Sequence, residues 1–590
     1  MPLTEAALAN LSQSAVENIN KWLTEPKFAE YKQELEQLMA DEKWQDLEDA
    51  FFKVLEFGTG GRRGTTGVGS NRINRVTIGE SAQALCEYAK SFDELAPEQG
   101  VVIACDTRLS SPELSKYTAQ VCAAAGFKTY IFDGFRATPE LSFAVRYHGA
   151  AVGIVISASH NPPADNGFKA YWRDGGQLVA PHDRGVLDIA ADITEIYAID
   201  YDQAVQEGKI VVIGEDVDLE YYAAAVAQAE GTNRNVKIVY SPLHGAGQRN
   251  SLPVLRKAGF KDIVLVDEQM TPDGNFPTVT NNKANPEERV ANDMAVAKLQ
   301  DERGDIAVTN DPDADRFGVM VRQGEGVVYL SGNQAASLAA DYSLANLQAK
   351  SKLTSKHYIA KTIVTTDLMG EIAAKYGAKI YENFLVGFKY IGELVYKKEQ
   401  TDEVFVMGAE ESFGFMKGDY TRDKDGAAGA LTLAEYAAEL KTDGKTLYDR
   451  LLELYSEHGV FVERLDNVQS PGADGFAKMQ TIMAGLRSDP PLKIGDNIVT
   501  AVLDYKSLQR RDLQTGEVTP VDCVVGDVVV FEFGDRRCRL TVRPSGTEPK
   551  IKFYTQWYEP ANGDIEAQYN KIERHIETLA SELEALLFED

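Results

Sequence analysis

The chain has 590 residues, which predicts roughly three to five domains. Its 90 acidic and 61 basic residues give a formal net charge of -29, which argues against nucleic acid or an anionic membrane as a partner. The five cysteines are scattered without the paired spacing of zinc or redox sites, and the polar N-terminus has no apolar signal core, so we expect a cytoplasmic protein.

After a helix-like start at residues 1–23, strands and helices alternate in three similar stretches. This alternation predicts α/β units with largely parallel sheets. The expected strands lie at 101–104, 129–132 and 152–156, then at 236–240, 263–266 and 306–308, and finally at 358–360, 378–381 and 404–407. Helices are expected between them, for example at 111–125 and 248–258.

The pattern changes after about Gly459, where short strands and turns precede a final helix from about Asp564. We therefore predict three similar α/β domains with mixed, largely parallel sheets, followed by a C-terminal α+β domain. The predicted boundaries are 1–212, 213–331, 332–458 and 459–590. The oligomeric state is left open.

In each α/β stretch the third strand leads into an unusual loop. These loops are residues 157–161, 311–316 and 410–414. Ligands gather outside the C-terminal ends of parallel strands. All three loops are thus expected where a ligand would bind.

The second loop carries three alternating carboxylates, Asp311, Asp313 and Asp315, and ends at Arg316. Carboxylates that lie close together repel one another, and a hard divalent cation relieves this repulsion. With no His or Cys beside them, their oxygens suit Mg²⁺. The alternative is a solvated acidic turn that Pro312 breaks.

The first loop, Ser157–Pro162, follows a strand rich in β-branched residues. Ser159 is placed to act as a nucleophile or phosphate carrier, and His160 as a base. The alternatives are an ordinary turn for the serine and a hydrogen-bonding scaffold for the histidine.

Together with 410–414 and Arg543–Pro549, these loops resemble the four signature loops of the α-D-phosphohexomutases, in the same order. The similarity spans roughly residues 57–554 and is greatest to the long phosphoglucomutase and phosphopentomutase branch. Any one of these loops alone would be a weak signal, whereas four in order are specific. The resemblance implies four domains around a central cleft.

The resemblance assigns the catalytic roles. It implies that Ser159 carries a phosphoryl group and that an oxygen of this group completes the Mg²⁺ sphere. Lys169 would be the general acid or base, with a proton affinity lowered by nearby positive charge. Arg63 would steady the reacting phosphate, although Arg62 stands where that branch more often has an apolar residue.

The resemblance also assigns the substrate contacts. Glu410 and Ser412 would bind sugar hydroxyls, and Arg316 and Lys424 would reach phosphate or sugar. The cradle for the phosphate that is not reacting comprises Arg543, Ser545, Gly546 and Thr547. Val386 stands where phosphoglucomutases commonly carry Thr, which leaves the sugar open. Arg108 and His244 are expected to be structural.

The implied function is the interconversion of glucose 1-phosphate and glucose 6-phosphate through phosphoserine and glucose 1,6-bisphosphate, with Mg²⁺ as cofactor. A phosphomannomutase, a phosphopentomutase, a catalytically idle phosphosugar-binding protein and a metal-dependent phosphatase are the alternatives. The intact Ser159, the Asp triplet and Lys169 argue against the idle protein.

Overall fold

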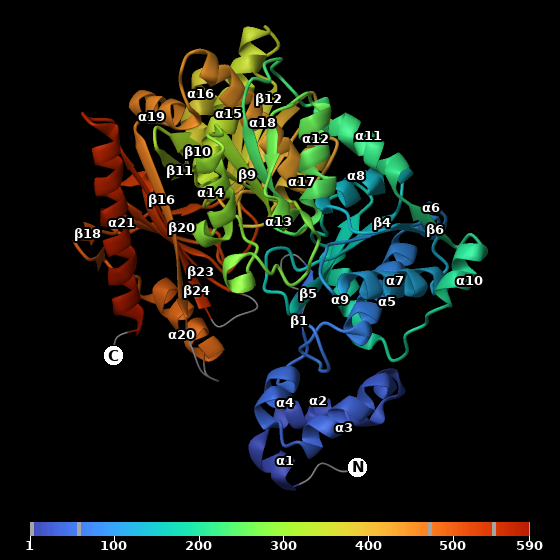
Figure 1. Ribbon diagram of the computed structural model, residues 1–590. Helices are drawn as coiled ribbons and strands as arrows, with labels where there is room; N and C mark the ends of the chain where they lie inside the picture. Colours follow the sequence, from blue (N-terminus) through green and yellow to red (C-terminus); the bar gives the residue numbers. More distant parts are fainter. Residues whose placement is uncertain (1–4, 56–60, 470–474, 546–549, 589–590) are drawn as a thin grey trace.

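The computed structural model describes residues 5–55, 61–469, 475–545 and 550–588 (Figure 1). Among these residues, no helix is both long enough and apolar enough to cross a membrane. The chain begins with a helical unit, residues 5–51, which lies apart from the sheets in Figure 1. It consists of α1 (Glu5–Asn10), α2 (Gln13–Thr24), η1 (Pro26–Tyr31), α3 (Lys32–Ala40) and α4 (Trp44–Phe51). Its apolar core includes Trp22, which is stacked on Phe28 at a ring-centroid distance of 4.4 Å.

The first α/β unit has a six-stranded sheet in the order β1-β5-β4-β2-β3-β6. Its strands are β1 (Arg62–Thr65), β2 (Val101–Cys105), β3 (Thr129–Phe132), β4 (Val152–Ile156), β5 (Asp165–Trp172) and β6 (Ile210–Ile213). Its helices are α5 (Arg75–Phe92), α6 (Ala96–Gln99), α7 (Ser111–Ala124), α8 (Thr138–His148), α9 (His182–Asp192) and α10 (Tyr201–Gln206).

The second unit has a five-stranded sheet in the order β11-β10-β9-β7-β8. Its strands are β7 (Ile238–Ser241), β8 (Ile263–Leu265), β9 (Ile306–Asn310), β10 (Phe317–Gln323) and β11 (Gly326–Tyr329). Its helices are α11 (Glu215–Val226), η2 (Ala246–Arg249), α12 (Ser251–Lys257), α13 (Asp267–Met270), η3 (Thr280–Asn282), η4 (Arg289–Asn292) and α14 (Asp293–Asp301).

The third unit has a four-stranded sheet in the order β13-β12-β14-β15. Its strands are β12 (His357–Thr362), β13 (Lys379–Phe384), β14 (Val404–Ala409) and β15 (Phe415–Lys417). Its helices are α15 (Gly332–Ala349), α16 (Leu368–Tyr376), α17 (Lys389–Lys398), α18 (Gly426–Thr442) and α19 (Leu447–His458).

The three sheets repeat one plan. In each, the first predicted strand lies between the second and the third and runs parallel to both. The third strand then pairs antiparallel with the strand that follows it, which is β5, β10 or β15. The predicted mixed, largely parallel sheets are therefore confirmed, although the sequence analysis did not identify these antiparallel strands.

The C-terminal part combines a β-sheet with helices, as predicted for an α+β domain. Its antiparallel sheet has the order β16-β24-β23-β22-β19-β20-β21 and is joined by helices α20 and α21. The elements are β16 (Val460–Gln469), α20 (Gly475–Ser488), β17 (Lys493–Ile494), β18 (Asn497–Ile498), β19 (Ala501–Asp504), β20 (Gln509–Asp512), β21 (Val518–Pro520), β22 (Val529–Phe533), β23 (Asp535–Pro544), β24 (Lys550–Glu559) and α21 (Ile565–Phe588). The four domain boundaries stay a prediction.

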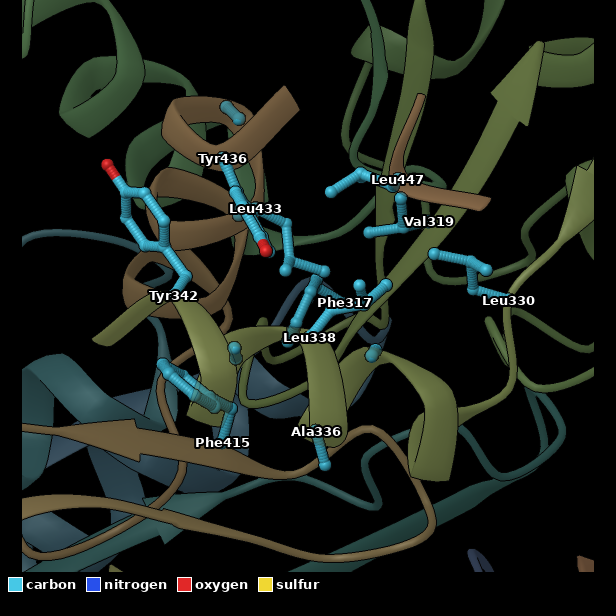
Figure 2. Packing of buried hydrophobic residues seen from close by; sticks show 14 of the residues in the cluster. Phe317, Val319, Leu330, Ala336, Leu338, Tyr342, Phe415, Leu433, Tyr436 and Leu447 are labelled. Carbon is cyan, nitrogen blue, oxygen red and sulfur yellow. The ribbon is translucent and has the colours of Figure 1, made fainter. Parts of the chain in front are cut away.

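One apolar cluster joins the second and third units (Figure 2). Phe317 of β10 lies in this cluster with Tyr342 of α15, Phe415 of β15 and Leu433 of α18. A Cβ atom at Gly429 would lie 2.1 Å from the Phe317 ring, so α18 approaches β10 closely because glycine stands there. This shared core fixes the loop after β9 relative to the loop after β14.

Candidate active site

Each of the three predicted loops contains a residue with left-handed backbone conformation. The φ angles are 53° at Ser159, 52° at Ala314 and 63° at Phe413. Non-glycine residues rarely adopt this conformation, and those that do are concentrated at functional sites. The repeated sheet plan thus ends three times in a sharply turned loop after the third strand.

The loops after β4 and β9 meet at Ser159 and Asp311. The Ser159 hydroxyl donates a hydrogen bond of 2.8 Å to Asp311 Oδ2, and His160 Nδ1 lies 3.3 Å from the same hydroxyl. Burial and the positive charge of Arg316 hold the pKa of His160 well below its usual value. A neutral imidazole beside the hydroxyl can accept a hydrogen bond from it.

Arg108 holds the serine loop in its turned conformation. Its buried guanidinium donates to three backbone carbonyls of that loop, those of Ser159, Asn161 and Pro162, and to the carbonyl of Asp165 at the start of β5, at 2.6–2.8 Å. Carbonyl groups in a tight turn have no ladder partner, and the forked donors of arginine satisfy them. This scaffold fixes the position of the Ser159 hydroxyl.

Asp311, Asp313 and Asp315 are buried, and one oxygen of each lies within 4.8 Å of the others. Burial and the two neighbouring carboxylates raise the pKa of Asp311 well above its usual value. The Oδ1 atoms of Asp313 and Asp315 are buried and accept no hydrogen bond from any residue that the structure describes. Orphaned carboxylate oxygens at this spacing fit a hard divalent cation such as Mg²⁺.

Lys169 of β5 reaches this carboxylate group. Its Nζ donates to Asp313 Oδ2 at 2.6 Å and lies 3.4 Å from Asp315 Oδ2. Burial alone would lower the pKa of Lys169, but the carboxylates of Asp313 and Asp315 raise it above its usual value. The nearest protein charges are negative and oppose the expected lowering of its proton affinity, which stays a prediction.

The side chains of Arg62 and Arg63, which are neighbours on β1, point in different directions. Arg62 is buried and donates to the Thr77 carbonyl and to Glu80 on α5. Burial lowers the pKa of Arg63, and the charges of Asp313 and Arg316 also act on that pKa. Of the two, Arg63 is thus on the side of the carboxylates.

The loop before α18 brings Lys424 to the same carboxylates. Lys424 Nζ lies 2.8 Å from Asp423 Oδ1 and 3.2 Å from Asp315 Oδ2. Asp423 is in turn fixed by the Tyr171 hydroxyl, which donates to its Oδ2 at 2.7 Å. The contact between Tyr171 and Asp423 ties β5 of the first unit to a loop of the third.

Glu410 and Arg316 lie where the second and third units meet. Glu410 is buried and accepts a hydrogen bond from the Gly387 amide at 3.0 Å. Arg316 forms an ion pair with Glu287 at 2.5 Å, and its backbone makes a β-bridge to Gly414. Ser412 lies two residues beyond Glu410 and is half-buried.

The C-terminal sheet contributes positive charge to this region. Burial and the charge of Arg543 lower the pKa of Lys552, while Glu411 opposes that change. Arg543 pairs with Lys552 across β23 and β24, and the Ser545 amide donates to the Lys550 carbonyl at 2.8 Å. Of the predicted cradle residues, Gly546 and Thr547 lie outside the described residues.

The sequence analysis missed three polar contributors: Thr138, Asp423 and Tyr171. The Thr138 hydroxyl donates to Asp313 Oδ2 at 2.7 Å, and its amide donates to the Asp313 carbonyl at 2.9 Å. The signal for Thr138 was a Thr-Pro pair that starts a helix, and the signal for Asp423 was its place beside Lys424.

Two further expectations concerned Val386 and His244. Val386 packs against an apolar cluster that includes Val528 and Tyr554 of the C-terminal sheet. His244 makes hydrogen bonds of 2.8 Å through both ring nitrogens, to Thr271 and Thr278. Neither residue makes a contact with the carboxylates, and His244 has the contacts of a structural residue.

Family models match three successive parts of the chain. They are described as Phosphoglucomutase/phosphomannomutase, alpha/beta/alpha domain I at residues 54–197, domain II at 219–324 and domain III at 331–457. A phosphoglucomutase of Staphylococcus epidermidis is 32% identical over 514 residues, covering 86% of this chain and 92% of that protein. A probable phosphomannomutase of Haemophilus influenzae is 33% identical over 512 residues, covering 85% and 97%.

Solved structures share the fold. A putative phosphomannomutase from Thermus thermophilus has a TM-score of 0.65 and 21% identity, covering 91% of this chain and 99% of that one. The parafusin phosphoglucomutase of Paramecium, in its open form, has a TM-score of 0.65 and 18% identity, covering 90% and 95%.

Proposed function

Because the chain belongs to the phosphoglucomutase/phosphomannomutase family, we propose that it interconverts glucose 1-phosphate and glucose 6-phosphate. The proposed route uses a phosphoserine at Ser159 and a glucose 1,6-bisphosphate that turns over within the site. The observation that carries the proposal is the set of contacts that converge on the Asp triplet. The Ser159 hydroxyl donates to Asp311, and Lys169 and Lys424 both reach the same Asp triplet.

Ser159 is the proposed carrier of the phosphoryl group that passes to and from the sugar. Asp311, Asp313 and Asp315 would hold Mg²⁺, which neutralises negative charge on a transferring phosphoryl group when bound. Arg63 would steady that group through its forked donors. Arg108 keeps the loop that presents Ser159 in place.

Lys169 is the proposed group that holds or moves the proton of the reacting sugar hydroxyl. His160 is the proposed hydrogen-bond acceptor beside the Ser159 hydroxyl. Glu410 and Ser412 offer acceptor and donor groups for sugar hydroxyls, and Arg316 and Lys424 offer positive charge. Arg543 and Ser545, with Gly546 and Thr547, would bind the distal phosphate. A site that encloses two phosphate positions would exclude water and so favour transfer over hydrolysis.

We also propose the division into a phosphoserine-loop domain (1–212), a metal-loop domain (213–331), a sugar-loop domain (332–458) and a phosphate-binding domain (459–590). A cytoplasmic location is supported by the five cysteines, all free and four of them buried. The second candidate substrate is mannose phosphate, because the Haemophilus relative named a probable phosphomannomutase is as similar as the phosphoglucomutases.

The test is a substrate panel with purified protein, Mg²⁺ and a trace of glucose 1,6-bisphosphate. Conversion of the 1-phosphates of glucose, mannose, ribose and glucosamine is followed by phosphorus NMR, which also detects inorganic phosphate. We expect glucose phosphate to react with the highest kcat/KM. Faster turnover of another sugar changes the substrate, net phosphate release indicates a phosphatase, and no turnover at all refutes the proposal.

A further inference from the structure

The helical unit, residues 5–51, precedes the part of the chain that the family models match, which begins at residue 54. It is not a loose appendage. Lys27 of η1 places its Nζ 3.0 Å from Glu80 Oε1 and 2.8 Å from the Ile193 carbonyl. The Lys27 and Glu80 side chains are only 12% and 11% exposed, so this ion pair is largely screened from water.

Glu80 uses its second oxygen for Arg62. The Arg62 guanidinium lies 3.2 Å from Glu80 Oε2 and also donates to the Thr77 carbonyl at 2.9 Å. One carboxylate on α5 thus binds a cation from the helical unit with one oxygen and a cation from β1 with the other. This Lys27–Glu80–Arg62 bridge gives a role to an arginine at a position where the phosphoglucomutase and phosphopentomutase branch more often has an apolar residue.

The bridge bears on Arg63 through strand geometry. Successive side chains on a strand point to opposite faces. Arg62 and Arg63 lie opposite Phe168 and Gly167 of β5, and β1 is a four-residue edge strand with β5 as its partner. Fixing the Arg62 side chain on the α5 side fixes the twist of β1, and therefore the direction in which Arg63 leaves it toward the Asp triplet.

The connection from β1 to α5 is also attached to the helical unit. The Asn71 amide donates to the Ala50 carbonyl at 2.9 Å, and the Arg75 amide donates to the Tyr31 hydroxyl at 3.1 Å. A Cβ atom at Gly69 would lie 2.5 Å from the Ala50 carbonyl oxygen, so α4 packs directly on this connection. The C-terminal part of the segment 61–75, residues 69–75, is therefore held by residues of the helical unit.

We infer that the helical unit is a positioning element for Arg63, acting through Lys27, Glu80 and Arg62. The inference rests on the proposed function of Arg63 at the reacting phosphate. Loss of the Lys27 cation leaves Glu80 with one partner and frees Arg62 to follow the carboxylate. Small displacements of a group that acts on the transition state cost rate more than binding.

The test is a double-mutant cycle between Lys27→Met and Arg63→Ala, measured by steady-state kinetics with glucose 1-phosphate. We expect Lys27→Met to lower kcat about tenfold with a change in KM below about twofold. In the Arg63→Ala background the same change should have almost no further effect. Lys27→Arg, which keeps the cation, should restore most of kcat, and Lys32→Met, at an exposed position of the same unit, should match the parent.

Equal losses in the two backgrounds would assign Lys27 a purely structural role and overturn the inference, as would an unchanged kcat. Hydrogen exchange of residues 61–66 gives a readout independent of turnover: it should be faster in Lys27→Met than in the parent and the Lys32→Met control. If the parent turns over no sugar phosphate, the proposed function fails. The inference then stands or falls on this exchange difference.

Discussion

Replacing Asp311 by Asn should stabilise the protein without divalent cations and strongly reduce its stabilisation by Mg²⁺. Asn has nearly the same shape as Asp. Its carbonyl can still accept from the Arg316 amide, which lies 3.0 Å from Asp311 Oδ1, and its amide group can donate to the Ser159 hydroxyl. The substitution therefore removes charge with little change in packing.

The magnitude follows from the spacing of the triplet. Two carboxylate charges 4.8 Å apart repel by about 3 kcal/mol at an effective dielectric constant of about 20. Lys169 and Lys424 offset the charges of Asp313 and Asp315, whereas no described cation lies within ion-pair distance of Asp311. We expect Asp311→Asn to gain about 1–3 kcal/mol of unfolding free energy in EDTA.

Mg²⁺ should offset this difference. A ligand at about one hundred times its Kd stabilises the native state by about 2.7 kcal/mol. The parent should gain that amount, and the variant, with one carboxylate fewer, should gain much less. Urea denaturation followed by tryptophan fluorescence, with EDTA and then with saturating Mg²⁺, measures both effects. A variant less stable than the parent in EDTA would refute the repulsion argument, and equal stabilisation of both proteins by Mg²⁺ would refute the location of the metal site.

Three further results are expected. Ser159→Ala should abolish mutase turnover and lower stability by about 1–3 kcal/mol, since the buried Asp311 carboxylate loses a donor; normal turnover with bisphosphate present would contradict the assignment. Arg543→Ala should raise KM for sugar phosphate about tenfold or more, because a charged contact to an anion contributes about 1.5–3 kcal/mol in ground and transition states alike; unchanged KM and kcat would leave the fourth loop without a substrate role. Burial alone would raise the pKa of Asp367, but the positive charges of Lys361 and Arg539 hold it down to about 2. The ionised Asp367 carboxylate thus adds about 2 kcal/mol of stability above about pH 4, and this contribution is lost as the pH falls toward 2. In urea titrations, the destabilisation caused by Asp367→Asn should therefore shrink over that pH range.

Much of the fold and the order of the loops could be predicted from the sequence. Runs such as Val101–Cys105 and Val152–Ile156 are apolar because strands in parallel sheets are buried on both faces, so their pattern is visible locally. The loop residues Ser159 and Asp311 follow such strands directly. Their place at a sheet edge follows from strand direction alone, without knowledge of how the sheets are oriented to one another.

The contacts of these residues were decided only by tertiary structure. Lys169 bonds to Asp313 across 144 positions, and Thr138 bonds to the same carboxylate across 175. No local pattern records which loops of different sheets face each other, so Thr138 was missed and the contacts of Lys169 with Asp313 and Asp315 were not predicted. Local composition also could not separate Arg62 from Arg63. Adjacent residues on a strand point to opposite faces, and only the packing of β1 between α5 and the Asp triplet determines which arginine faces the carboxylates.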